Sequence, residues 1–144
     1  MAGNGFVCGA YAPVKWPADA AALRAFIHDP SSCTFLFSLV NAHGRPVKLR
    51  SKPDQGYSVN LDGALNGPGF GDTDLRLMAG SAADEPHGCV VAGSNSFELD
   101  HEAERAAGLP PIPFEYDQKL LAGDDGKGRA LVTFAAAEIE VYQL

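Results

Sequence analysis

The chain has 144 residues, 46% of them hydrophobic and 20% charged, a composition typical of a globular domain that excludes an intrinsically disordered chain. Its 18 acidic and 11 basic residues give a net charge of -7, which argues against nucleic acid and anionic membranes as partners because both repel negative charge. The longest nearly apolar stretch, residues 34–40, has the length of one strand and excludes a membrane-spanning helix. We expect residues 1–144 to form a single domain.

The N-terminal residues and the cysteines indicate the compartment. The opening sequence MAGNGFVCGAY lacks the basic and apolar segments of a secretory signal. The three cysteines, Cys8, Cys33 and Cys89, are odd in number and lack CxxC spacing, which favours a reducing compartment over a disulfide framework. We therefore expect a cytoplasmic protein.

Short runs of β-type residues, separated by Gly, Pro, Asn and Asp, predict most of the secondary structure. The run 34–40 is interrupted by polarity only at Ser38, so we expect a central strand that is covered on both faces. About eight strands in a chain of this length predict a mainly β fold, a two-sheet antiparallel β-sandwich with one or two short helices. The predicted strands are 6–11, 34–40, 47–50, 57–61, 74–78, 88–92, 130–134 and 138–144.

Two segments carry helical signals. Residues 17–29 begin with Pro17 and an acidic first turn, and they predict a helix of one to three turns before Pro30. Residues 100–108 begin with Asp100, which can cap a helix, and end at Gly108, in the place of a C-terminal glycine. We expect both helices to be short.

Four stretches, taken in order, resemble the TLDc family, most closely its protist branch. They are NGFVCGAYAPVKW, FIHDPSSCTFLFSLVNAHGRPVKL, NGPGFGDTDLRLM and LLAGDDGKGRALVTFAAAEIEVYQL. The resemblance covers nearly the whole chain, from Asn4 to Tyr142. Cys8 replaces the usual phenylalanine, Asp72 and Thr73 replace a glycine pair, and the chain begins after the family's N-terminal portion.

The resemblance implies a TLDc-like sandwich and a non-enzymatic role. TLDc proteins are linked to protection against oxidative stress and, in several members, to binding and regulating the proton-pumping ATPase, and no catalytic centre is shared across the family. We therefore expect a protein-interaction module without a cofactor, acting as a small accessory subunit or adaptor in a larger assembly. The alternative is a ligand-binding sandwich that takes a glycan or uses calcium.

The loop GPGFGDTDLRL, residues 67–77, admits three interpretations. A phosphate loop is disfavoured because there is no lysine and the following residues alternate as a strand. We favour a structural loop, in which glycines permit positive φ and Phe70 fills the core. A calcium site would need several oxygens to converge, although the spacing fits no EF-hand. The residues that would supply them are Asp62, Asn66, Asp72 and Asp74.

Other candidate sites have weaker signals. No pair of histidines and cysteines has zinc-ligand spacing, and no nucleophile motif surrounds Cys33 or Cys89. Glu138 and Glu140 are two residues apart on the polar face of a predicted strand, where solvated carboxylates are the ordinary arrangement. The zinc candidates are His28, Cys33, His43, His87 and Cys89.

Since the signals for a metal site or a catalytic site are weak, we expect this protein to bind another protein. A missing N-terminal portion would leave a strand edge at 4–11 or 138–144 that a partner strand can complete. The tryptophan Trp16 follows the first strand, where it either anchors a partner or seals the core. The predicted partner-binding residues are Trp16, Phe70, Asp72 and Asp74.

Overall fold

The structure is a computed structural model, and it describes residues 5–14, 26–27, 29, 33–52, 58–60, 69–71, 74–78, 88–90, 96–112, 121 and 133–135. Strands dominate these ranges. In chain order the elements are β1 (Val7–Tyr11), β2 (Phe26–Ile27), β3 (Phe35–Val40), β4 (Val47–Ser51), β5 (Val59–Asn60), β6 (Gly69–Phe70), β7 (Leu75–Met78), β8 (Gly88–Val90), β9 (Phe97–Leu99), α1 (His101–Ala106) and β10 (Thr133–Ala135).

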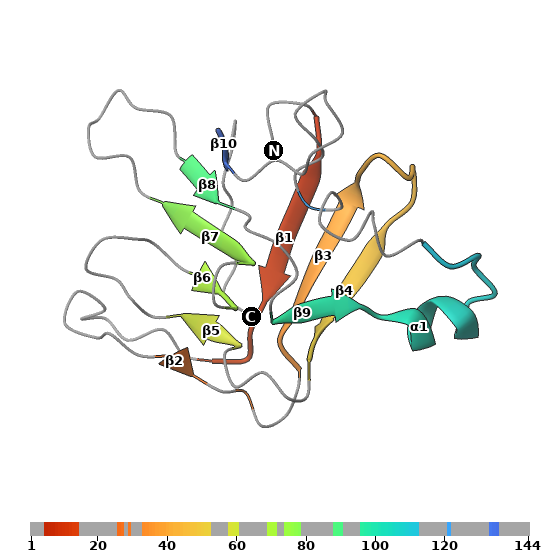
Figure 1. The fold of residues 1–144 in the computed structure, drawn as a ribbon, viewed down its shortest axis with the longest axis horizontal. Helices are drawn as coiled ribbons and strands as arrows, with labels where there is room; N and C mark the ends of the chain where they lie inside the picture. Colours follow the sequence, from red (N-terminus) through yellow and green to blue (C-terminus); the bar gives the residue numbers. More distant parts are fainter. Residues whose placement is uncertain are drawn as a thin grey trace.

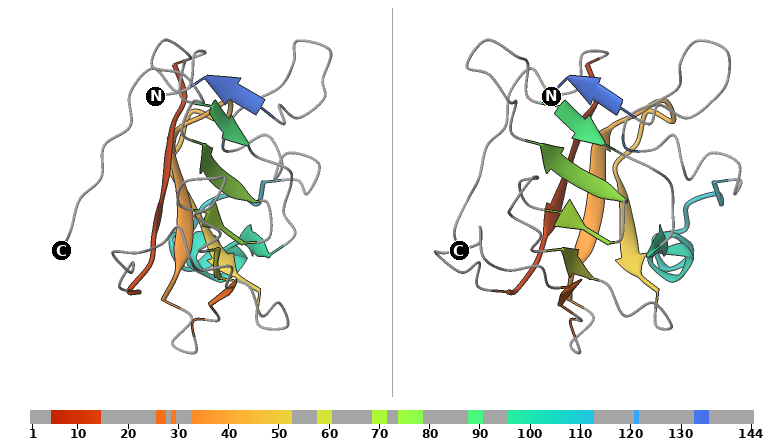
Figure 2. Two further views of the ribbon diagram at one scale, coloured as in Figure 1. Left: turned by 90° about the vertical axis from the view of Figure 1, so that its left-hand side faces the viewer. Right: turned by 60° about the vertical axis from the view of Figure 1, so that its left-hand side comes forward.

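The strands form two antiparallel sheets, which confirms the predicted mainly β, two-sheet sandwich. The four-stranded sheet has the order β1-β3-β4-β9, and the six-stranded sheet has the order β10-β8-β7-β6-β5-β2. In Figure 1 the longer strands β1, β3 and β4 lie side by side, and the short strands β5 to β8 cross the other half of the molecule. The turned views in Figure 2 show the two sheets as separate layers.

The core lies between the sheets and is built by strand alternation. Successive side chains of a strand point to opposite faces, so every second residue of β4 is buried: Val47, Leu49 and Ser51. The residues between them, Lys48 and Arg50, lie on the outer face. The core cluster draws on both sheets and comprises Leu36, Val47, Leu49, Phe70, Leu75, Phe97, Leu99, Ile112 and Leu121.

Strand β3 is central in its sheet, as predicted, but it is not covered on both faces. It pairs with β1 on one side and β4 on the other. Leu36 is fully buried, whereas Leu39 and Val40 are 50% and 49% exposed. The register shifts between β1 and the end of β3, where one extra β3 residue stands in the ladder. Leu39 continues the outward positions of Phe35 and Phe37, and the bulge breaks the alternation of inward and outward side chains, so that Val40 reaches the surface as well.

Helix α1 confirms the prediction for residues 100–108. The side chain of Asp100 accepts a hydrogen bond from the backbone N–H of Ala103, at 3.1 Å, as an N-cap does. Gly108 has a φ of +68° and donates its N–H to the carbonyl of Arg105. Leu109 donates to the carbonyl of Glu104. These two bonds form a Schellman motif, which ends the helix at a glycine.

The helix predicted for residues 17–29 is wrong over its described end. Phe26 and Ile27 form strand β2, which pairs with Val59 and Asn60 of β5. The apolar pattern of this segment fits either period, and pairing with a sheet edge decides between them. Residues 17–25 and 28 lie outside the described residues.

The other predicted strands are present where the structure describes them, and the sequence missed three short ones. Strands β2, β6 and β9 were absent from the prediction, because two or three residues give too little periodicity to read. The predicted strand 138–144 lies outside the described residues. Within the described ranges, no helix is long and apolar enough to cross a membrane.

Candidate interaction surface

Of the four predicted partner-binding residues, the structure describes two, Phe70 and Asp74. Phe70 and Asp74 are only 8% and 2% exposed. Both therefore lie in the interior of the protein. Trp16 and Asp72 lie outside the described residues.

Asp74 joins the two sheets through its carboxylate. It precedes β7 in the six-stranded sheet, and its hydrogen-bond donors lie at the start of β9 in the four-stranded sheet. Oδ1 accepts the backbone N–H groups of Ser96 and Phe97, each at 3.1 Å, and Oδ2 accepts the N–H of Ser96 at 3.0 Å. Because strand pairing cannot connect the two layers, this carboxylate provides a polar link across the sandwich.

The same burial changes the acidity of the group. Removal from water disfavours the charged carboxylate and raises the pKa of Asp74 to about 6. The N–H groups of Ser96 and Phe97 act in the opposite direction because they stabilise the charge. The buried carboxyl of Asp74 is therefore a weaker acid than an exposed aspartate.

Gly71 shows why the loop GPGFGDTDLRL contains glycine at this point. Its φ is +67°, and a Cβ atom built on it would lie 2.9 Å from Cγ of Asp74 and 3.0 Å from Cβ of Ser96. The position therefore excludes a side chain for both conformational and steric reasons. The N–H of Gly71 donates to the carbonyl of Ser58, at 3.1 Å. This geometry supports the structural interpretation of the loop, and β6 and β7 are the strands that it connects.

Of the four residues proposed as calcium ligands, the structure describes only Asp74. Both oxygens of Asp74 accept backbone N–H groups, so they are engaged in the fold. Asp62, Asn66 and Asp72 lie outside the described residues. Where the structure does describe the chain, no three histidine, cysteine or acidic side chains are arranged to hold a metal ion.

Of the cysteine and histidine candidates, the structure describes the surroundings of Cys33 and His43. Cys8 is half-buried in β1, and Cys33 is exposed. His43 lies in the turn after β3, where its N–H donates to Oδ1 of Asn41 at 2.9 Å. His28, His87, Glu138 and Glu140 lie outside the described residues, and Cys89 is described by its backbone in β8.

A second buried carboxylate, Asp29, organises the approach to β3. Its Oδ2 accepts the N–H of Thr34 at 2.7 Å and the hydroxyl of Thr34 at 2.8 Å. Its own N–H donates to Oγ of Ser58, at 3.3 Å. Ser58 Oγ also lies 3.4 Å from Oγ of Ser51, at the end of β4. This polar cluster links the end of β4 to the start of β5.

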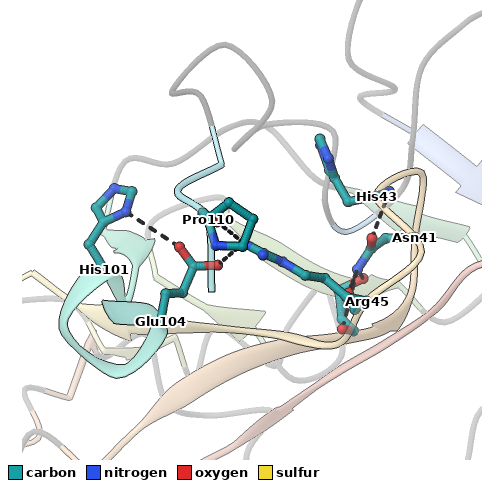
Figure 3. A network of polar contacts seen from close by, with 7 residues as sticks. Asn41, His43, Arg45, His101, Glu104 and Pro110 are labelled. Atoms are coloured by element: carbon teal, nitrogen blue, oxygen red, sulfur yellow. Dashed lines mark hydrogen bonds and ion pairs between the residues drawn. The ribbon is translucent and has the colours of Figure 1, made fainter. Parts of the chain in front are cut away.

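An ion pair attaches α1 to the hairpin between β3 and β4, as Figure 3 shows. Nη2 of Arg45 donates to Oε1 of Glu104 at 2.7 Å and to the carbonyl of Pro110 at 2.6 Å. The side chain of Glu104 is 9% exposed, and its Oε2 lies 3.6 Å from Nδ1 of His101. Arg45 itself extends from a turn in which Asn41 donates to its carbonyl at 2.8 Å. The contacts hold both the helix and the segment after it against the sheet.

The outer face of the four-stranded sheet carries an aromatic row, defined as Tyr11, Phe35 and Phe37. The ring centroids of Tyr11 and Phe35 are 5.3 Å apart, and those of Phe35 and Phe37 are 6.3 Å apart. All three residues are half-buried. Phe37 pairs with Gly9 of β1, and its ring occupies the place of the missing side chain, since a Cβ on Gly9 would lie 2.6 Å from Cζ.

Apolar exposure continues beyond this row. Leu39 and Val40, at the bulged end of β3, are about half exposed. Phe35, Phe37 and Leu39 occupy successive outward positions of β3, and Tyr11 lies opposite Phe35 on β1. Contiguous exposed apolar surface is characteristic of interaction sites, whereas single exposed apolar residues are ordinary.

The sequence contained a signal for this face that the prediction did not use. The run 34–40 by itself predicts a strand covered on both sides because its residues are almost all apolar. The neighbouring run 47–50 alternates Val, Lys, Leu and Arg, which marks one face of that strand as solvated. Since paired strands share their faces, the same solvated face extends to Phe35 and Phe37.

Comparison of the chain with protein-family models, with curated proteins and with solved structures finds no match.

Proposed function

We propose that this protein is a non-enzymatic interaction module that binds another protein through the outer face of its four-stranded sheet. The observation that carries the proposal is the set of outward apolar side chains on this face: the half-buried aromatic row, and Leu39 and Val40, which are 50% and 49% exposed. A soluble domain that exposes such a surface gains free energy when a partner removes it from water.

The face is stiff as well as apolar. Its rings lie on β1 and β3, which are paired along their length, and the opposite faces of β3 and β4 are fixed in the core. A rigid surface loses little conformational entropy when it binds, and large aromatic side chains provide much contact area for few rotatable bonds. These properties support a binding role.

The resemblance to TLDc proteins suggests the kind of assembly to which the module would belong. It implies an accessory subunit or adaptor of a cytoplasmic assembly, with a proton-pumping ATPase and the response to oxidative stress as the family's associations. Strand addition at the β1 side of the sheet is the mode of completion that the sequence suggests. Within the described residues β1 has β3 as its paired strand.

The test is affinity purification of the full chain, tagged at the N-terminus, from its own cells, followed by size-exclusion chromatography. We expect defined proteins in constant stoichiometry that co-elute with the chain. Recovery of the folded chain alone, as a monomer, would contradict an interaction role. A charged substitution at the exposed apolar end, L39K, provides the matched variant, and it should reduce co-elution without unfolding the chain because Leu39 lies outside the core.

A further inference from the structure

We propose that the outer face is specific for a protein segment in which an apolar or aromatic side chain lies next to a carboxylate. This inference rests on the proposed function and names the chemistry of the partner. Three features of the face carry it: an apolar platform, one uncompensated cation, and a phenolic hydroxyl beside the platform.

The platform is centred on Phe35. The ring of Tyr11 lies on one side of it, with an interplanar angle of 30°, and the ring of Phe37 lies on the other. Tilted rings at these separations leave a surface on which a flat or branched apolar side chain can pack. The register places Tyr11 directly opposite Phe35 on the adjacent strand, so the platform spans two strands.

Two cations accompany the platform on β4, and they differ in their environment. Arg50 is compensated, because its guanidinium lies 3.2 Å from carboxylate oxygens of both Glu98 and Glu102. Lys48 is exposed, and its Nζ lies 4.8 Å from the centroid of the Phe35 ring. No carboxylate of the described residues forms an ion pair with Lys48. The face therefore presents one ammonium group, held above an aromatic ring, that a partner's carboxylate can pair with.

The hydroxyl of Tyr11 adds a second donor. Within the part of the chain that the structure describes, Tyr11 contacts Phe35 through its ring and forms no hydrogen bond. Lys48 and Tyr11 thus flank Phe35 with groups that can donate hydrogen bonds. A partner whose apolar side chain packs on the aromatic row beside the Lys48 ammonium lies close to both donors, and carboxylate oxygens are the acceptors that gain most from a charged donor.

Charge distinguishes this occupant from a nucleic acid, which also stacks on aromatic rings. Binding of single strands depends on several cations along the phosphate backbone, and here the second cation is already paired. The net charge of -7 opposes both kinds of anion at long range. At physiological ionic strength that repulsion is screened beyond about 8 Å, so the contact at Lys48 determines binding of a single carboxylate.

The experiment is panning of a random peptide library on the immobilised full chain in three forms: wild type, K48E and R105E. Arg105 is exposed in the last turn of α1, and R105E makes the same change of charge there. Wild type and R105E should enrich peptides with Asp or Glu next to an apolar or aromatic residue. On K48E their recovery should fall about tenfold, because attraction becomes repulsion, and Lys or Arg should replace the acidic position.

The outcomes that overturn the inference are distinct from those that overturn the function. The inference is refuted if K48E enriches the same acidic peptides as wild type. It is also refuted if wild type enriches peptides without a charge preference, or enriches none. If a stoichiometric protein partner is still recovered from cells, the interaction role stands. Binding of a single-stranded oligonucleotide that K48E abolishes would assign the face to nucleic acid instead. The variant K48M keeps an apolar stem over Phe35 without the charge. Its thermal melting shows whether the fold depends on the ammonium group of Lys48.

Discussion

Gly71 and Asp74 are in direct contact within the loop between β6 and β7. The backbone of Gly71 lies so close to the Asp74 carboxyl that an added Cβ would stand 2.9 Å from its Cγ. The carboxylate in turn accepts the N–H groups of Ser96 and Phe97 at the start of β9. The glycine thus makes room for the group that links the sheets.

Substitution of this glycine should therefore cost more than its backbone conformation explains. G71A places alanine at a φ of +67°, against Asp74 and Ser96. G44A is the matched control, because Gly44 also has a φ of +67° but, among the described residues beyond its chain neighbours, no atom lies within 4 Å of its Cβ position. We expect G44A to reduce the free energy of unfolding by about 1–2 kcal/mol, and G71A by about 2–4 kcal/mol. Urea unfolding measures both, and equal losses would contradict the close packing.

The buried carboxylate should make stability depend on pH in an unusual direction. The pKa of Asp74 rises from 3.8 to about 6 on folding, so the folded state binds this proton more tightly than the unfolded state. The resulting stabilisation is complete at low pH and is lost as pH rises through about 6, by up to about 3 kcal/mol. D74N, which keeps the shape and one acceptor oxygen, should remove this dependence.

The measurement is the free energy of unfolding of wild type and D74N between pH 4 and 8. The difference between them isolates Asp74 from the other carboxylates of the chain. Wild type should lose stability relative to D74N as pH rises through about 6. A constant difference would show that the hydrogen bonds from Ser96 and Phe97 balance the desolvation of Asp74. A difference that grows in favour of wild type with pH would show that they outweigh it.

The ion pair of Arg45 and Glu104 should contribute substantially to stability, unlike the exposed pairs. E104A leaves Arg45 without its carboxylate at a site where the Glu104 side chain is 9% exposed. We expect a loss of about 2 kcal/mol in the free energy of unfolding. E102A removes a partner of Arg50 whose side chain is 73% exposed, and it should cost less than about 0.5 kcal/mol. Similar losses in thermal or chemical unfolding would refute a special role for Glu104.

The sheets and helix α1 could be predicted from the sequence because their signals are local. Alternation in residues 47–50 identifies β4, and the spacing of Asp100 and Gly108 identifies α1. Strand β9 is three residues long, so its pattern is too short to read, although Phe97 and Leu99 are central to the core. Its position depends on pairing with β4, which is a contact between residues far apart in the chain.

The candidate surface was harder to predict because it depends on register. Apolar residues at 35–40 alone do not show which side chains face water. Leu39 continues the outward positions of Phe35 and Phe37, whereas Val40 reaches the surface because of the bulge at the end of β3, and no residue type in the run marks that bulge. Likewise, the sequence predicts that the acidic residue Asp74 lies at the surface or binds a metal. In the structure it is buried, and its carboxylate accepts backbone hydrogen bonds from residues far away in the chain.

The most direct test of the interaction role is site-specific photo-crosslinking in the protein's own cells. A photoreactive phenylalanine replaces Phe37 on the outer face or, as the control, Arg105 on α1. We predict a defined, light-dependent covalent complex with another protein from position 37 and none from position 105. No crosslinked protein at position 37, or the same products from both positions, would contradict the claim that this face binds a protein.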